Sequence, residues 1–379
     1  MKGEFLMEKT MGDMAKHLKQ LIPANIPETY TIKPMFKNIS DEEDIRNGVL
    51  AFRNFLYRFC DYLLADKSLC DEPKKGNKKF WDETTLTVEF PFLNNIRSIL
   101  INIGQDGVLS EKGDSISIDG WEKLSTKRSL SKNPNIKIPA SQIIKSMRFL
   151  TECGIDFDGI DLSMKKPDTS KIPTIRITYP DCPVMLTGWK ALGIAQNELS
   201  HRDNDDILFR CDYRALKNDD TDIDSILQDF VYPLSAPLKE FVLNSHQHYL
   251  DSGMECTLEQ RMMATHFIYS YKRKVLWRFS SSLYNGYRIL LKTENMSEYA
   301  DVIGKFPGFL QEKIAKGYGC HRKTGASHGN CQRECQGFRF PLNESLLDIG
   351  KELEIWQDSE LASMQKNKKG KKTSQVASV

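Results

Sequence analysis

The chain lacks the short motifs that mark several common nucleotide-binding and metal-dependent families. It contains no G-x-x-x-x-G-K-[ST] phosphate loop, no dinucleotide-binding G-x-G-x-x-G and no H-E-x-x-H pair. It also has no C-x2-C pair among its nine cysteines and no internal repeat at a period of about 20 to 50 residues. These absences remove the familiar versions of those families and leave catalysis by another arrangement open.

Long apolar runs and an excess of one charge are also missing. No stretch approaches the roughly 18 apolar residues of a membrane-spanning helix, and charged residues scattered through Met1–Leu21 argue against a signal peptide. The 53 Lys and Arg residues nearly balance the 51 Asp and Glu residues, so the net charge of +2 creates no general attraction for nucleic acid or anionic membranes. Cys60, Cys153 and Cys211 stand singly in apolar segments, as reduced thiols do. We therefore expect a cytoplasmic protein.

What is present is an ordinary globular composition, with 40% hydrophobic and 27% charged residues. A length of 379 residues suits two or three domains. We predict an α+β fold in which antiparallel and mixed sheets have flanking helices. The predicted divisions are an N-terminal α+β domain at 1–133, a middle α/β-type domain at 134–256, a C-terminal α+β domain at 257–362 and a disordered basic tail at 363–379.

The spacing of apolar residues predicts the individual elements. Helical spacing predicts helices at 41–64, 141–153, 185–194, 223–250 (divided by Pro233 and Pro237), 296–305, 307–316 and 346–356, and a capping box at 257–260 predicts the start of another. Alternation predicts strands at 85–90, 98–103, 115–119, 160–162, 174–178, 207–212 and 338–340, and a hairpin of 275–280 with 286–291. In that hairpin we expect alternate residues from Trp277 to Leu291 to share one face.

The loop after the helix at 307–316 is the best site candidate. Cys320, His328, Cys331 and Cys335 offer the four soft and imidazole ligands of a structural tetrahedral zinc site, with His321 as an alternative ligand. Five glycines between 317 and 337 would let this loop fold tightly around a metal ion. The C-x10-C-x3-C spacing lacks zinc-finger knuckles, so free packing thiols and a redox-labile pair are open alternatives.

Other candidate residues carry weaker signals. Cys182 lies between a predicted strand and a predicted helix, where an N-cap position would stabilise a thiolate nucleophile. However, Gly188 stands where a phosphatase-type loop requires arginine. The acidic stretches 203–206 and 220–224 are expected to form solvated turns. The three histidines between 246 and 266 are expected to be packing or surface residues, at His246, His248 and His266.

Two stretches near the C-terminus carry a family resemblance. The hairpin Lys274–Lys292 and the segment Gly337–Leu353 are similar to the end of a family of bacterial proteins of unknown function. The strand-then-helix ending, with Arg339-Phe-Pro-Leu342 before the helix, also resembles small YdhG-like α+β domains. The resemblance implies an α+β C-terminal domain and implies no known activity. The Cys/His loop is an insertion relative to the YdhG-like layout.

These observations predict a non-catalytic binding or regulatory protein, most directly a protein-binding one, with a structural zinc site in its C-terminal domain. One alternative is an enzyme that uses an open metal site at the same loop or the Cys182 thiolate. A second alternative is a nucleic-acid-binding accessory protein that uses the basic runs Lys366–Lys372 and Lys74–Lys79.

Overall fold

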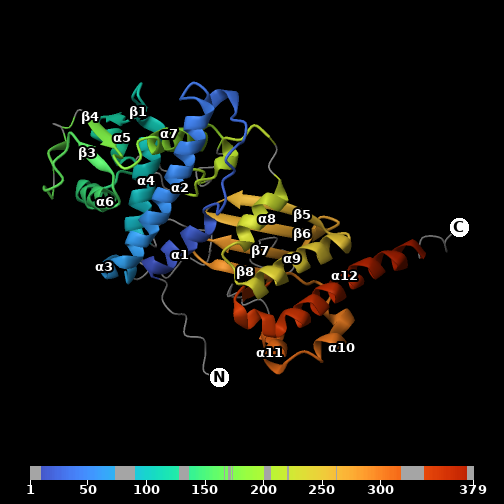
Figure 1. Cartoon of the computed structure of the whole chain (residues 1–379). Helices are drawn as coiled ribbons and strands as arrows, with labels where there is room; N and C mark the ends of the chain where they lie inside the picture. Colours follow the sequence, from blue (N-terminus) through green and yellow to red (C-terminus); the bar gives the residue numbers. More distant parts are fainter. Residues whose placement is uncertain are drawn as a thin grey trace. The chain divides into compact units, whose positions relative to one another are not determined.

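The computed structural model describes residues 10–72, 90–127, 136–165, 167–169, 172, 174–199, 206–219, 222–261, 263–316 and 337–373 (Figure 1). The fold is α+β, as predicted, with helices and two antiparallel sheets. Contacts divide the chain into two compact units. Unit 1 comprises Met1–Asp229 with Gln260–Met263, and unit 2 comprises Phe230–Glu259 with Ala264–Val379.

Unit 1 combines a helical core with a small sheet. Its elements are α1 (Met11–Leu21), η1 (Pro34–Phe36), α2 (Glu42–Ala65), α3 (Lys67–Cys70), α4 (Pro91–Asp106), β1 (Val108–Leu109), β2 (Ile116–Asp119), α5 (Trp121–Ser125), α6 (Ala140–Glu152), β3 (Asp156–Asp158), β4 (Thr174–Thr178), α7 (Met185–Glu198), η3 (Tyr213–Ala215) and most of α8 (Ile223–Val231). The strand order is β1-β2-β4-β3, and all neighbours are antiparallel. Ile116 pairs with Ile177 and Ile118 with Ile175, so one face of this sheet carries four buried isoleucines.

The core of unit 1 depends on close approaches between helices. A Cβ added at Gly188 of α7 would lie 2.0 Å from the carbonyl carbon of Gly48 in α2. A Cβ at Gly193 would lie 2.3 Å from the carbonyl carbon of Gly104 in α4. The backbones therefore meet where neither helix has a side chain. Trp189, beside the first crossing, is fully buried, and its indole N–H donates to the Leu100 carbonyl over 2.8 Å.

Unit 2 is built on a five-stranded antiparallel sheet of order β5-β6-β7-β8-β9. Its elements are α9 (Ala236–Asp251), β5 (Glu255–Arg261), β6 (Ala264–Tyr271), β7 (Lys274–Ser282), β8 (Gly286–Leu291), η4 (Met296–Tyr299), α10 (Ala300–Ile303), α11 (Gly308–Lys316), β9 (Phe338–Pro341), η6 (Glu344–Ile349) and α12 (Gly350–Thr373). Figure 1 shows α9 lying across this sheet and α12 running out toward the C-terminus.

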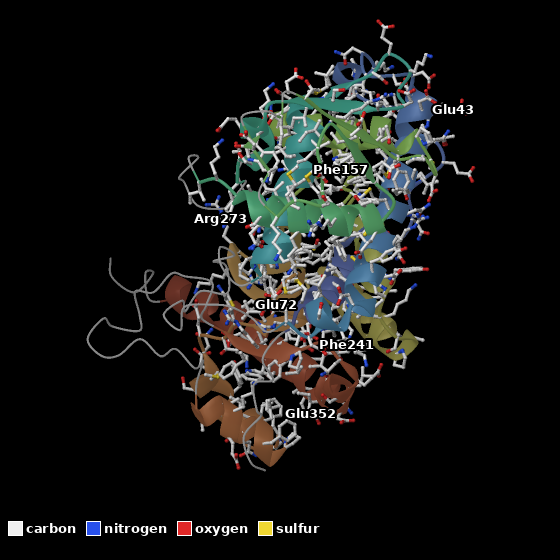
Figure 2. All side chains as sticks on the ribbon, turned by 90° about the vertical axis from the view of Figure 1, so that its left-hand side faces the viewer. Glu43, Glu72, Phe157, Phe241, Arg273 and Glu352 are labelled. Atoms are coloured by element: carbon white, nitrogen blue, oxygen red, sulfur yellow. The ribbon has the colours of Figure 1, made fainter. Side chains whose placement is uncertain are left out.

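One face of the unit 2 sheet is apolar and covered by helices. Strand pairing sets Trp277 opposite Leu291 and Phe279 opposite Ile289, which confirms the shared face predicted for the hairpin. Phe241 of α9, labelled in Figure 2, packs edge-on against Phe279 with ring centroids 6.4 Å apart. On the same face, α12 contributes aromatic packing through Trp356, whose ring lies 4.8 Å from that of Phe338 on β9. The apolar face is therefore the core of unit 2.

Several predicted strands are wrong. Residues 98–103 lie inside α4, where every residue from 95 to 104 is buried, so the helix has no exposed face there and apolar residues occur on several of its sides. Residues 207–212 form turns in which Cys211 adopts a φ of 51°. The strand expected at 160–162 lies earlier, at β3. Residues 257–260 belong to β5 and do not open a helix, because pairing with β6 overrides the local capping pattern.

Most of the predicted helices are present. Helices near 41–64, 141–153 and 185–194 are confirmed, and the stretch 223–250 is divided into α8 and α9 around its prolines, as expected. The helix α12 continues to Thr373, although the segment from 363 was predicted to be disordered. The division near residue 230 also differs from the predicted boundaries. For example, β2 and β4 pair in one sheet from either side of 133/134.

Within the described parts of the chain, no helix combines the length and apolar character that crossing a membrane requires.

Candidate functional site

The predicted zinc ligands lie outside the described residues. Cys320, His321, His328, Cys331 and Cys335 all fall within 317–336, between α11 and β9. Across the ranges that the structure describes, no group of three or more His, Cys, Asp and Glu side chains is arranged to hold a metal ion. The zinc site therefore stays a prediction from the sequence.

The same loop contains a motif that the sequence analysis missed. Gly325-Ala-Ser-His-Gly329 matches the G-x-S-x-G pattern of a nucleophile elbow, and it also lies outside the described residues. An elbow requires a strand before the serine and a helix after it. The nearest described elements have the opposite order, because α11 precedes the loop and β9 follows it. Residues 317–336 on both sides of the motif lie outside the described ranges, so the match stays a feature of the sequence.

Cys182 does not occupy the helix position expected for it. α7 begins at Met185 with Val184 as its N-cap, and the Cys182 carbonyl accepts a hydrogen bond from the Met185 amide over 3.0 Å. The thiol thus lies two residues before the cap, so the N-cap prediction on which the thiolate hypothesis rested is wrong. The close approach of Gly188 to Gly48 also explains why no arginine can stand at position 188.

Asp206 is not in a solvated turn. Its carboxylate is buried and accepts a hydrogen bond from the Arg97 Nε atom, 2.7 Å from Oδ1, within a two-oxygen ion pair. In contrast, Asp222 and Asp224 are exposed, as predicted for the second acidic stretch. A buried carboxylate needs a buried partner. Arg97 stands 109 positions away in the sequence, so the local acidic pattern could not reveal the pair.

The three histidines all have side-chain partners in unit 2. His248 lies on the surface with Nε2 2.8 Å from Asp358, and His266 is half-buried with Nδ1 2.9 Å from the Ser280 hydroxyl. His246 is buried, and its Nδ1 atom lies 2.7 Å from the Tyr269 hydroxyl. The structure thus places His246 in the core of unit 2 and His248 at its surface, as expected.

The second face of the unit 2 sheet gathers arginines from three adjacent strands. Strand pairing aligns Ile268, Arg278, Leu290 and Arg339 in one row across β6, β7, β8 and β9. The next row on the same face, two residues along each strand, holds His266, Ser280, Arg288 and Pro341. We call Arg278, Arg288, Arg339 and His266 the arginine face.

The arginine face is polar, half-exposed and held in place. All four of its side chains are half-buried, whereas Ile268 and Leu290 between them are buried. The Arg288 Nη2 atom donates to the Asn285 side-chain oxygen over 2.9 Å, and each of the four residues makes further interactions within the chain. Arginine guanidinium groups held in this way present fixed donors to carboxylate or phosphate groups.

The sequence contains part of the signal for the arginine face. The hairpin alternation that places Trp277 and Phe279 on one face must place Arg278 and Ser280 on the other. Arg288 follows from the same alternation on the second strand. The position of Arg339 on this face follows only from the pairing of β9 with β8, which no local pattern in the sequence predicts.

Comparisons of the chain with protein-family models, with curated proteins and with solved structures found no match. The resemblance of the C-terminal stretches to bacterial proteins and to YdhG-like domains therefore stays a hypothesis.

Proposed function

We propose that this chain is a cytoplasmic, non-catalytic binding protein that holds an acidic segment of a partner protein on the arginine face. The observation that supports the proposal is the convergence of Arg278, Arg288 and Arg339 from three neighbouring strands on one sheet face. Neighbouring strands lie about 4.8 Å apart, so the backbones at Arg278 and Arg339 are separated by about 10 Å. Two or three carboxylates along an extended peptide match that span, because alternate residues of a strand lie about 6.6 Å apart.

The chemistry of this face favours a protein over a nucleic acid. Tight binding to a duplex typically involves about 6 to 10 phosphate contacts, and this face offers three arginines. Binding to single strands uses aromatic rings as stacking platforms, and the two rows across β6 to β9 contain no Phe, Tyr or Trp. Arginine clusters that recognise short acidic motifs are a recurring mode of peptide binding.

A charge-neutralising triple variant tests the proposal. Arg278→Gln, Arg288→Gln and Arg339→Gln together remove three positive charges from the face. The matched control removes three positive charges from exposed positions on unit 2 helices and their ends, through Lys305→Gln, Lys351→Gln and Lys366→Gln. Fluorescence anisotropy would follow a labelled ten-residue peptide of alternating Glu and Leu at about 50 and 500 mM NaCl, where screening differs strongly.

We expect the intact chain and the lysine control to bind the peptide at low salt, and the arginine variant to bind at least tenfold more weakly. Circular dichroism of all three proteins checks that the half-buried arginines can be replaced without unfolding. Absence of binding by the intact chain, or equal binding by the arginine variant and the control, would refute the proposal. Stronger binding of a 20-nucleotide single strand than of the peptide would replace it with the nucleic-acid alternative.

The predicted zinc site is part of the same proposal. Ligation by Cys320, His328, Cys331 and Cys335 would close the loop just before β9, the strand that carries Arg339. Elemental analysis of untagged protein should then find about one zinc per chain. Cys331→Ala should lower the melting temperature sharply. Metal-free protein with an unchanged melting temperature in the variant would remove zinc from the proposal and leave the arginine face untouched.

A further inference from the structure

The geometry of unit 2 points to Cys256 as a reactive thiol, activated by Tyr269 and His246 and open to soft electrophiles such as hydrogen peroxide. This inference is independent of the arginine face, because Tyr269 lies on the opposite, helix-covered face of the sheet. No residue of this cluster was singled out as a nucleophile from the sequence.

Three elements bring the cluster together. α9 supplies His246, then the chain turns at Gly253, whose φ is 80°, and enters β5 with Cys256 as its second residue. The turn is fixed by a hydrogen bond from the Met254 amide to the Tyr249 carbonyl over 3.0 Å. β6, which neighbours β5 in the sheet, supplies Tyr269.

The Tyr269 hydroxyl is the centre of the cluster. It is hydrogen-bonded to the Cys256 side chain and lies 2.7 Å from the Nδ1 atom of His246. The two rings meet edge-on with centroids 5.7 Å apart, and Tyr269 is fully buried. Burial, followed by the neighbouring Cys256 side chain, raises the pKa of Tyr269, so the phenol keeps its proton throughout the range in which thiols ionise.

A phenol has one proton to donate, so the Tyr269 O–H donates either to Cys256 or to His246, and the relay that we infer is the first of these arrangements. When the Tyr269 O–H donates to the Cys256 sulfur, its oxygen accepts the N–H at Nδ1 of His246. Hydrogen bonds to the ionised form of an acid favour that form, so this donor chain lowers the free energy of the thiolate. Among the described residues, Glu354 and Asp358 of α12 act on Tyr249, the neighbour of Tyr269, and Glu255 precedes Cys256 in β5.

The remaining described cysteines provide an internal comparison. Three of them, Cys60, Cys153 and Cys211, are buried, and burial raises the pKa of each thiol. Two others, Cys70 and Cys182, are half-buried, as Cys256 is. Accessibility and a phenol–imidazole donor chain therefore coincide at Cys256, and this is the combination that makes a thiol reactive.

The chemistry needs one co-reactant, hydrogen peroxide. The thiolate sulfur attacks one peroxide oxygen, a sulfur–oxygen bond forms and the oxygen–oxygen bond breaks. The product is sulfenic acid at Cys256, and the leaving hydroxide takes a proton to become water. The sulfur loses two electrons, which reduce the peroxide. Iodoacetamide reports the same nucleophile, because the sulfur–carbon bond forms as iodide leaves.

Cysteine-resolved alkylation of the full chain tests the inference. The protein would be treated with iodoacetamide between pH 6 and 9, quenched at intervals and digested, and the labelling rate of each cysteine measured by mass spectrometry. At pH 7 we expect Cys256 to be labelled at least fivefold faster than Cys70 and Cys182. Its rate should reach half of its maximum below the ordinary thiol pKa of about 8.5.

Two variants isolate the relay. Tyr269→Phe removes the donor and keeps the ring, so labelling of Cys256 should fall at least fivefold. Tyr271→Phe, two residues further along at the last position of the same strand, should leave it unchanged. Equal labelling of Cys256, Cys70 and Cys182 in the unmodified chain would overturn the inference, and this comparison holds even if Tyr269→Phe fails to fold. An unchanged Cys256 rate in folded Tyr269→Phe would overturn it as well.

Discussion

Replacing Gly188 with alanine should destabilise unit 1, although alanine is the better helix former. A Cβ at this position would lie 2.0, 2.2 and 2.3 Å from three backbone atoms of Gly48 and Val49. Ordinary contact begins at 3.4 Å, so the closest pair must separate by about 1.4 Å (3.4 − 2.0). All three atoms belong to the backbone of α2, so no side chain can rotate away and the two helices must move apart.

The size of the effect follows from two opposing contributions. Replacing glycine with alanine inside a helix stabilises by about 1 kcal/mol. Forcing an extra carbon into a packed interface costs about 1–3 kcal/mol, and a gap of about 1 Å forfeits up to half of the dispersion energy of the contacts that flank it. Those contacts include Trp189 against Phe52, with centroids 5.7 Å apart. We expect a net loss of about 2 kcal/mol, which lowers the melting temperature by about 4 to 8 °C for a unit of this size.

Calorimetry and urea unfolding monitored by circular dichroism would measure the change. Gly308→Ala is the matched control, since a Cβ at the first position of α11 meets nothing within 4 Å. It should be neutral or slightly stabilising. Gly193→Ala, at the second crossing, should behave like Gly188→Ala. A Gly188→Ala protein that melts within 1 °C of the unmodified chain, or above it, would show that the helices do not meet at this glycine.

Three other predictions concern buried polar groups. Asp206→Asn strands the Arg97 charge in the core and should cost about 3–5 kcal/mol in urea unfolding, whereas Asp181→Asn, at an exposed pair, should cost less than about 0.5 kcal/mol. Glu360→Ala removes the acceptor of two backbone amides and a tyrosine hydroxyl, so both amides should lose protection from hydrogen exchange; retained protection would contradict this role. Burial raises the pKa of the Cys153 thiol from 9.0 to about 12, and burial also raises the pKa of two further thiols of unit 1. The contribution of these three thiols to the free energy of unfolding is therefore complete below pH 9 and is lost as the pH rises. At pH 10, ionisation of each thiol in the unfolded chain should lower the free energy of unfolding by about 1.4 kcal/mol. Cys153→Ala should remove about a third of the pH dependence that these three thiols produce.

The sequence predicted elements well where one face is polar. The β7–β8 hairpin has that character, since Trp277 and Phe279 alternate with Arg278 and Ser280, and the predicted shared face is confirmed. The prediction failed where both faces are buried. α4 has no exposed side over 95–104, so apolar residues occur on several of its sides and its Ser98–Ile103 stretch shows an alternation that looks like a strand.

The candidate site was less predictable, because its parts meet through tertiary contacts. Alternation along the hairpin could have identified Arg278 and Arg288, but the pairing of β8 with β9 was needed to add Arg339. The residues with the strongest sequence signal, in the Cys/His loop, lie outside the described ranges. Sequence patterns of this kind record which residue types stand near one another along the chain, and a site on a sheet gathers residues from distant positions.

Cys256 illustrates that limit most directly. In the sequence it stands singly in the stretch Met254-Glu-Cys-Thr-Leu-Glu-Gln260, which reads locally as the start of a helix. In a helix its neighbours would be residues three and four positions away, and none of those is Tyr269 or His246. Pairing of β5 with β6 replaces those neighbours with a buried phenol, and the packing of α9 adds the imidazole behind it. The change from helix to strand at 257–260 is therefore what turns an ordinary cysteine into the candidate nucleophile, so the labelling experiment tests the strand assignment and the relay together.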